Sequence, residues 1–158
     1  MSSYDTAQVC INGHLICTSI ETLPDDTQNY CSECGVKTIT DCPSCHAKLR
    51  GYYNSDDHYI KSTTVESYCY NCGAPYPWTV SEIESMQLLI QEDEAMDEQQ
   101  KSSLIEIIPY IITETPKTKV ATVRVQKALK SVGKFTADGI RQFVIDFGCE
   151  LAKKAIGL

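Results

Sequence analysis

The sequence contains no long hydrophobic run and none of the short motifs of the commonest enzyme classes. Its longest apolar cluster, residues 104–112, is interrupted by Glu106 and Pro109, whereas a membrane-spanning helix needs about 20 apolar residues. It has no Gly-x-Ser-x-Gly, no glycine-rich phosphate loop and no His-Glu-x-x-His. These absences argue against a membrane span and a small-molecule substrate, and we expect that the protein is not an enzyme.

The first residues also lack the features of a secretory signal. Residues 1–6 have neither a basic region nor an apolar one, and a disulfide framework requires an oxidising compartment. The nine cysteines are an odd number, which does not suit a set of disulfides alone. We therefore expect a cytoplasmic protein with reduced cysteines.

Metal-ligand residues, by contrast, are numerous and regularly spaced. Zinc prefers four thiolate or imidazole ligands, and a two-residue gap lets both sulfurs of a tight turn reach one ion. Gly13, Gly35 and Gly73 lie where such turns need a positive φ. Three Cys-x-x-Cys pairs and one Cys-x-x-x-His pair therefore predict two closed sites, and two Zn2+ per chain, with these eight ligands: Cys10, His14, Cys31, Cys34, Cys42, Cys45, Cys69 and Cys72.

The pairing of these half-sites depends on the entropy of loop closure. Pairing in sequence order closes the shortest loops, and it joins residues 10, 14, 31 and 34 in one site and residues 42, 45, 69 and 72 in the other. The short gap between Cys34 and Cys42 leaves a crossed pairing open, in which the two middle pairs share an ion. The first and last pairs would then form the second site.

The cysteine pairs also allow other chemistries. A thioredoxin-like redox role for Cys42 and Cys45 would require a helix after the motif, whereas residues 48–53 are typical of a strand. Iron suits a site with four sulfur ligands as well as zinc does. His46 and His58 fall outside the two sets of four ligands, and we interpret them as surface residues. Cys17 has no recognisable catalytic partner.

The sequence changes from strand-like to helical at residues 75–78. β-branched and aromatic residues dominate four earlier segments, which predict strands: residues 8–20, 37–40, 48–53 and 59–68. Short hairpins bury little apolar surface, so the ions are expected to replace the missing core. The chain is predicted to be α+β, with two small β zinc ribbons in residues 1–78 followed by a C-terminal α-helical bundle in residues 79–158.

Capping signals divide the second half into helices. Thr79–Glu82 and Asp97–Gln100 have the spacing of a capping box. Pro109 is expected to bend or end the second helix. Thr115–Pro116 should open a third helix, and Gly133 should end it.

The last predicted helix, capped by Thr136, has two apolar stripes. Ile140, Val144, Phe147 and Leu151 form one stripe, and the other consists of Ile145, Cys149, Ala152 and Ile156. Either the helix is central in its own bundle, or one stripe lies in a subunit interface. The second interpretation predicts a homo-oligomer.

Aromatic residues gather around the second ribbon. They are either a stacking platform for single-stranded nucleic acid or, as we favour, the packing around the metal site. Only Arg50 and Lys61 provide nearby positive charge, against Asp56, Asp57 and Glu66. The residues are Tyr52, Tyr53, Tyr59, Tyr68, Tyr70, Tyr76 and Trp78.

The net charge of −7 is unevenly distributed. Residues 1–80 carry −5, residues 81–116 carry −8 and residues 117–158 carry +6. Two zinc ions bound by seven thiolates would deepen the net charge to about −10. The basic stretch allows a nucleic-acid interface, but the neighbouring acidic segment is expected to compensate it.

The motifs also resemble a known family. Residues 8–14 (QVCINGH), 30–35 (YCSECG), 42–45 (CPSC), 50–53 (RGYY) and 68–78 (YCYNCGAPYPW) are similar to an uncharacterised bacterial family of predicted double zinc-ribbon proteins with a helical C-terminal region. The resemblance extends into the helical half around residues 115–121. It implies the same eight ligands and adds little about activity.

These observations predict a bacterial zinc-binding interaction or adaptor protein that binds a protein partner and self-associates. The alternative is a nucleic-acid-binding regulator that uses the ribbon aromatics and the basic third helix. Phosphate contacts would make such binding steeply dependent on salt.

Overall fold

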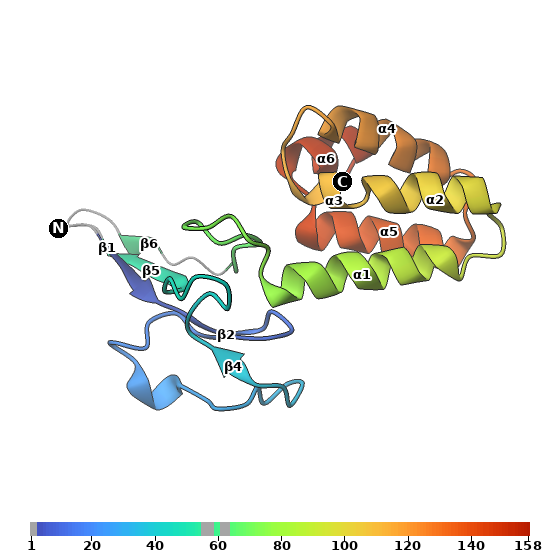
Figure 1. Cartoon of the computed structure of the whole chain (residues 1–158). Helices are drawn as coiled ribbons and strands as arrows, with labels where there is room; N and C mark the ends of the chain where they lie inside the picture. The colour runs from blue at the N-terminus through green and yellow to red at the C-terminus, as the bar shows by residue number, and fades with distance from the viewer. Residues whose placement is uncertain (1–2, 55–58, 61–63) are drawn as a thin grey trace. The chain divides into compact units, whose positions relative to one another are not determined.

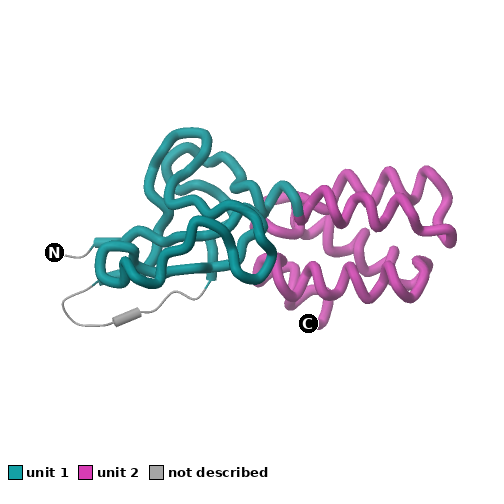
Figure 2. Tube along the Cα trace, turned by 90° about the horizontal axis from the view of Figure 1, so that it is seen from below, with its two compact units in different colours: residues 1–81 teal, residues 82–158 magenta. Residues whose placement is uncertain are grey.

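The computed structural model describes residues 3–54, 59–60 and 64–158 (Figure 1). The chain forms two compact units, residues 1–81 and residues 82–158 (Figure 2), called here the ribbon unit and the helical unit. The proposal that residues 1–78 and 79–158 are separate domains stays a prediction. His58 lies outside the described residues.

The ribbon unit contains two small antiparallel sheets. In the first, β5 (Arg50–Asn54) lies between β1 (Ser3–Thr6) and β6 (Tyr59–Ile60). In the second, β2 (Gln8–Cys10) lies between β3 (Leu15–Cys17) and β4 (Thr38–Ile39). A single 3-10 turn, η1 (Pro24–Asp26), lies in the long connection that follows β3.

The predicted strands are found in shortened form. The segment 8–20 divides into β2 and β3 because the turn at Cys10–His14 reverses the chain. Of the described part of segment 59–68, residues 59–60 form β6, and Tyr68 makes only an isolated bridge to Pro75. β1 was not predicted, because its pairing with β5 joins residues that are 44 to 51 positions apart, from Thr6 with Arg50 to Ser3 with Asn54.

One small core fills the ribbon unit. Tyr76 and Trp78 are buried, with exposed fractions of 1% and 4%, and their rings stack with centroids 4.7 Å apart. The same cluster contains two residues of the second metal site. Its members are Ala7, Val9, Cys42, Leu49, Cys69, Tyr76 and Trp78.

The remaining chain is helical and has its own core. Ile90, Ile108, Ile111, Val125, Ile140 and Val144 are completely or almost completely buried. No helix of the described residues is long and apolar enough to cross a bilayer. The helices are α1 (Pro77–Gln91), α2 (Glu98–Ile107), α3 (Pro109–Ile112), α4 (Thr118–Ala128), α5 (Lys134–Phe147) and α6 (Glu150–Ile156).

The predicted capping signals had mixed outcomes. Asp97 and Gln100 form the expected capping box at the start of α2. The capping box predicted at Thr79 is wrong: α1 begins at Pro77, and the Thr79 hydroxyl donates to the carbonyl of Ser67 at 2.6 Å. The Thr136 cap is also wrong, because Gly133 is the N-cap of α5 and Thr136 is buried inside it. α4 ends at Ala128, five residues before Gly133.

The single last helix predicted after Thr136 is two helices. Gly148 leaves the helical conformation with φ −63° and ψ 141°, and the backbone N–H of Cys149 donates to the carbonyl of Ile111 at 2.9 Å. α6 then packs against α4. The second predicted stripe is therefore not continuous, because Ala152 is fully buried whereas Ile145 is 45% exposed.

Candidate metal centres

The three Cys-x-x-Cys turns are built by the same short-range hydrogen bonds. In the three Cys-x-x-Cys turns the first cysteine accepts, through its carbonyl, the N–H four residues later: Gly35 to Cys31, His46 to Cys42 and Gly73 to Cys69, all at 2.8 Å. Isolated antiparallel bridges close the base of each turn: Tyr30 with Lys37, Asp41 with Lys48 and Tyr68 with Pro75. The local sequence thus forms three equivalent knuckles.

Each metal turn contains one residue with a positive φ. In the Cys-x-x-Cys turns this residue directly follows the second cysteine, whereas in the turn of Cys10 it directly precedes His14. Gly13, Gly35 and Gly73 have φ values of 91°, 73° and 73°, as their position predicted. In the third turn the same position is taken by His46 with φ 60°. His46 is exposed, so its role in the structure is conformational and it joins neither ligand set.

The first candidate site combines a turn between β2 and β3 with the following knuckle. The Sγ of Cys10 lies 3.4 Å from the Nδ1 of His14 and 3.8 Å from the Sγ of Cys34. The Sγ of Cys31 lies 3.5 Å from the same Nδ1. The four ligand atoms all lie within 4.8 Å of one another.

The second candidate site joins the other two knuckles. The Sγ atoms of Cys42 and Cys72 are 3.8 Å apart, and those of Cys45 and Cys69 are 3.7 Å apart. All four sulfurs lie within 4.8 Å of one another. The structure therefore groups the eight residues in sequence order, and the crossed pairing is not the one observed.

These distances fit a tetrahedral ion. With Zn–S bonds of about 2.3 Å and Zn–N bonds of about 2.0–2.1 Å, tetrahedral geometry separates two sulfurs by about 3.8 Å and a sulfur from a nitrogen by about 3.5 Å. The observed separations agree with both values. All nine cysteines are free thiols. Each cluster can hold one metal ion.

Backbone amides favour the thiolate form that a metal requires at several of the ligands. At Cys72, however, the N–H of Ala74 is outweighed by contacts with Cys45 and by burial, which raise the pKa of that thiol to about 12. The N–H of Cys72, together with that of Asn71, lowers the pKa of the Cys69 thiol to about 6 despite partial burial. The N–H of Val36 likewise lowers the pKa of Cys34. Cys10 differs, because burial raises the pKa of its thiol.

Two neighbouring polar side chains orient the ligands. The Nε2 of His14 lies 3.6 Å from a carboxylate oxygen of Glu33, which favours the tautomer that leaves Nδ1 free to bind an ion. The side-chain amide of Asn71 donates to the Sγ of Cys45 at 3.5 Å and is the main cause of the lowered pKa of Cys45. Both residues lie between the two cysteines of a Cys-x-x-Cys turn. Apart from that position, the sequence did not indicate that they contact the ligands.

The remaining cysteines belong to neither cluster. Cys17 is buried at the end of β3, where its thiol contacts the carbonyl of Leu23 at 3.6 Å. Cys149 is half-buried at the N-cap of α6. Neither lies in a group of candidate ligands among the described residues.

The aromatic residues of the second ribbon do not form one surface. Tyr76 and Trp78 are buried beside Cys42 and Cys69, whereas Tyr70 is 48% exposed and its ring lies 3.8 Å from the Arg50 guanidinium. Tyr59 has no described side chain. Tyr76 and Trp78 therefore pack around the metal site, which is the interpretation that we favoured from the sequence.

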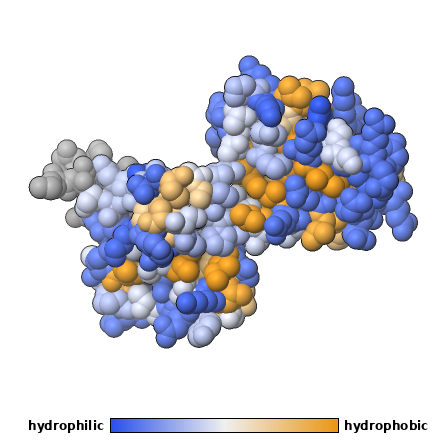
Figure 3. All heavy atoms as spheres, in the orientation of Figure 1, coloured by the Kyte–Doolittle hydropathy of each residue, from blue (hydrophilic) through white to orange (hydrophobic). Residues whose placement is uncertain are grey.

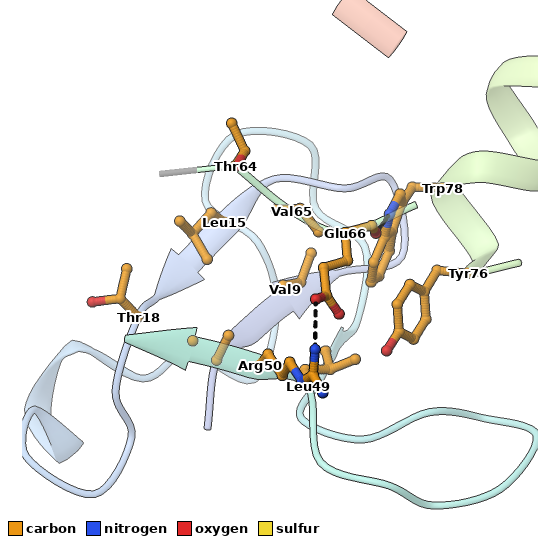
Figure 4. Close-up of a pocket in the computed structure, with 12 residues that line it drawn as sticks. Val9, Leu15, Thr18, Leu49, Arg50, Thr64, Val65, Glu66, Tyr76 and Trp78 are labelled. Carbon is orange, nitrogen blue, oxygen red and sulfur yellow. Dashed lines mark hydrogen bonds and ion pairs between the residues drawn. The ribbon is translucent and has the colours of Figure 1, made fainter. Parts of the chain in front are cut away.

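A small cavity of about 10 Å³ lies in the core of the ribbon unit. Figure 4 shows Glu66 directed toward Arg50, and their ion pair measures 3.6 Å. Burial nevertheless raises the pKa of Glu66 above its usual value. One oxygen of Glu66 and the hydroxyl of Tyr76 have no hydrogen-bond partner among the described residues.

Comparison with known proteins identifies a family and no closer relative. No curated protein and no solved structure matches the chain. The family model described as "Uncharacterized protein conserved in bacteria (DUF2321)" matches residues 3–156. The resemblance inferred from the cysteine turns is thus confirmed over nearly the whole chain, which belongs to this family of uncharacterised bacterial proteins.

Proposed function

We propose that the protein is a zinc-stabilised, non-enzymatic interaction protein that binds a protein partner and self-associates. The observation that carries the proposal is the closure of both sites. Each cluster provides four protein ligands at tetrahedral separations, whereas a catalytic zinc keeps a coordination position for water or substrate. Zinc in these sites would therefore stabilise the folded state and would not bind a substrate.

The helical unit supports the interaction part of the proposal. Large apolar side chains stand exposed on it among charged residues, and such surface is typical of contact sites between proteins when it is contiguous. Figure 3 shows apolar surface on one face of this unit. The most exposed are Phe135 at 80%, Leu88 at 66%, Val120 at 54%, Val123 at 48%, Leu158 at 46% and Ile145 at 45%.

Charge favours a protein over a nucleic acid as the partner. The chain carries −7 before metal binding, and a net negative charge opposes binding to phosphates. Tyr76 and Trp78, which a stacking platform would need on the surface, are buried in the ribbon core.

Iron in the four-cysteine site is the chemical alternative to zinc.

Metal analysis tests the sites. Purified protein should contain two equivalents of zinc per chain, and Cys10→Ser or Cys42→Ser should each reduce the content to one by removing a ligand. Elemental mass spectrometry measures this content, with Cys149→Ser as the control that should keep both ions. One equivalent in the wild type would contradict the two-site assignment.

The partner class is tested by the salt dependence of binding. Affinity for random single-stranded DNA or RNA should be negligible at physiological salt, whereas binding of a protein captured by the tagged full chain should weaken far less steeply as salt is raised. Nucleic-acid binding whose affinity falls steeply with salt would instead favour the regulator, because phosphate neutralisation releases counterions.

A further inference from the structure

The helical unit contains a groove between α2 and α4 that the metal sites do not explain. These helices pack against each other, and the groove between them has a volume of about 450 Å³, within the range of ligand-binding pockets. Its apolar lining comes from Met96, Leu104 and Ala128, and its polar lining from Asp97, Gln99, Gln100, Ser103, Arg124, Lys127 and Ser131.

The groove presents a local positive charge on a chain whose net charge is −7. Arg124 and Lys127 are exposed side chains of α4, and neither forms an ion pair with any described residue. Residues 117–134 contain six basic residues and no acidic one. The α4 side of the groove is therefore cationic.

The one acid on the groove is already engaged. A carboxylate oxygen of Asp97 accepts the N–H of Gln100 at 2.8 Å as the N-cap of α2. Carboxylates at a helix N-terminus are stabilised there by the helix dipole. Asp97 is thus held by its own helix, and it forms no ion pair with Arg124 or Lys127.

We propose that this groove binds an acidic segment of a partner protein, with an apolar side chain against Ala128 and with carboxylates against Arg124 and Lys127. The inference rests on the proposed interaction function and names the class of partner. Arginine and lysine bind carboxylates by charge-assisted hydrogen bonds.

The groove fits such a peptide better than a nucleic acid. No aromatic residue from the described part of the chain lines it, so bases would find no ring there on which to stack. Leu104 and Met96 belong to the core below the groove, with exposed fractions of 2% and 7%, and Ala128 is the half-buried apolar residue of the lining. An apolar side chain of the peptide would therefore pack against Ala128 and the aliphatic parts of Arg124 and Lys127, and phosphates cannot bury apolar surface in this way.

A labelled peptide tests the proposal on the full zinc-loaded chain. The probe is a fluorescein-labelled peptide of about twelve residues, rich in glutamate and containing two leucines, and fluorescence anisotropy follows its binding at fixed salt. The Arg124→Glu/Lys127→Glu double variant should weaken binding by about tenfold or more, because two attractive contacts become repulsive. Replacing the peptide's glutamates by glutamine, or its leucines by serine, should also weaken it.

The matched control is Lys119→Glu/Lys130→Glu. It makes the same change in net charge on two other residues of the 117–134 stretch, both exposed and neither lining the groove, so it should weaken binding far less. Equal weakening by the two double variants, or no binding of the peptide to the wild type, would overturn the groove assignment. Displacement of the bound peptide by oligothymidylate would overturn the choice of a protein partner.

These outcomes are separable from the proposed function itself. If the groove assignment alone is wrong, the double variant still contains two zinc ions and captures the same protein partner as the wild type. If the interaction function is wrong, the wild type captures no specific partner whatever the peptide result.

Discussion

At the scale of single residues, the metal turns depend on backbone conformations that few side chains adopt. Gly13, Gly35, Gly73 and His46 all have positive φ, and a left-handed conformation costs a non-glycine residue about 1–2 kcal/mol. Three of these turns meet that requirement with glycine. The turn of Cys42 and Cys45 has His46 at this position instead, and its backbone is therefore more strained.

Gly13 differs from Gly35 in its neighbours, and this difference predicts unequal mutant effects. A Cβ at Gly13 would lie 2.9 Å from the Cβ of Trp78, whereas a Cβ at Gly35 would meet nothing within 4 Å. Gly35→Ala should cost about 1 kcal/mol of stability from backbone strain alone, and Gly13→Ala should cost more because Trp78 must move. Thermal unfolding followed by tryptophan fluorescence measures both, and equal costs would contradict the packing of Trp78 on this turn.

Two carboxyl groups of the helical unit, the buried Asp93 and the half-buried Glu82, predict opposite responses to mutation. Hydrogen bonds from the Thr136 side chain and from the N–H groups of Ala95 and Gly133 lower the pKa of Asp93. Burial and the nearby charge of Asp146 raise the pKa of Glu82. The ionised form of Asp93 thus stabilises the fold, whereas that of Glu82 destabilises it.

The sign of each effect sets the pH window. The stabilisation from Asp93 is complete above its unfolded pKa of about 3.9 and is lost as pH falls through its lower folded pKa, whereas the cost of Glu82 vanishes as pH falls toward its unfolded pKa of about 4.3. At pH 7, Asp93→Asn should therefore lower the melting temperature of the helical circular dichroism signal and Glu82→Gln should raise it. Shifts of the same sign would refute this electrostatic account.

At the scale of elements, α1 begins where the second metal site ends. The indole N–H of Trp78 donates to the carbonyl of Glu66 at 2.9 Å, and the Thr79 hydroxyl donates to that of Ser67. Both acceptors lie just before Cys69. The first turn of α1 is therefore held to the segment that leads into the metal site, which explains why Thr79 is not used as a cap.

Near the end of α5, two adjacent residues differ in burial, one lying in the core and the other on the surface. Val144 is fully buried and Ile145 is 45% exposed. Val144→Glu should unfold the helical unit, because a buried unpaired carboxylate costs several kcal/mol. Ile145→Glu should leave the circular dichroism spectrum unchanged and, under the proposed self-association, shift the molar mass measured by light scattering toward the monomer. A wild type that is already monomeric at micromolar concentration would refute the self-association.

At the scale of the whole molecule, both metal sites depend on one core. Val9 precedes Cys10 in β2, and it packs in the same cluster as Cys42 and Cys69. A core of this size stabilises a fold only weakly, which is why metal binding contributes to folding directly in small domains. The helical unit has buried residues of its own from α1 to α6.

Removal of the metal should therefore unfold the ribbon unit and leave much of the helical unit folded. With excess chelator, we expect the fluorescence of Trp78 to shift toward that of an exposed indole as the ribbon core opens, while much of the helical circular dichroism signal remains. Re-addition of zinc should restore the fluorescence. Complete loss of the helical signal would show instead that the helices require the ribbons.

The sequence by itself determined the features that depend on neighbours a few residues away. The ligand turns, the positive φ at Gly13, Gly35 and Gly73, and the capping box of α2 follow from short-range hydrogen bonds. The sequential grouping of the ligands also follows, because it closes the shortest loops. The α+β class results from these turns together with the helical periodicity after residue 78.

Only the tertiary structure decided the features that join distant residues. The pairing of β1 with β5, the contact of Asn71 with Cys45 and the groove between α2 and α4 each unite segments that are remote in sequence. The division of α5 from α6 belongs here too, because the N–H of Cys149 is satisfied by the carbonyl of Ile111 in α3. A periodic pattern reports which faces are apolar, but the partner that covers each face is set by packing.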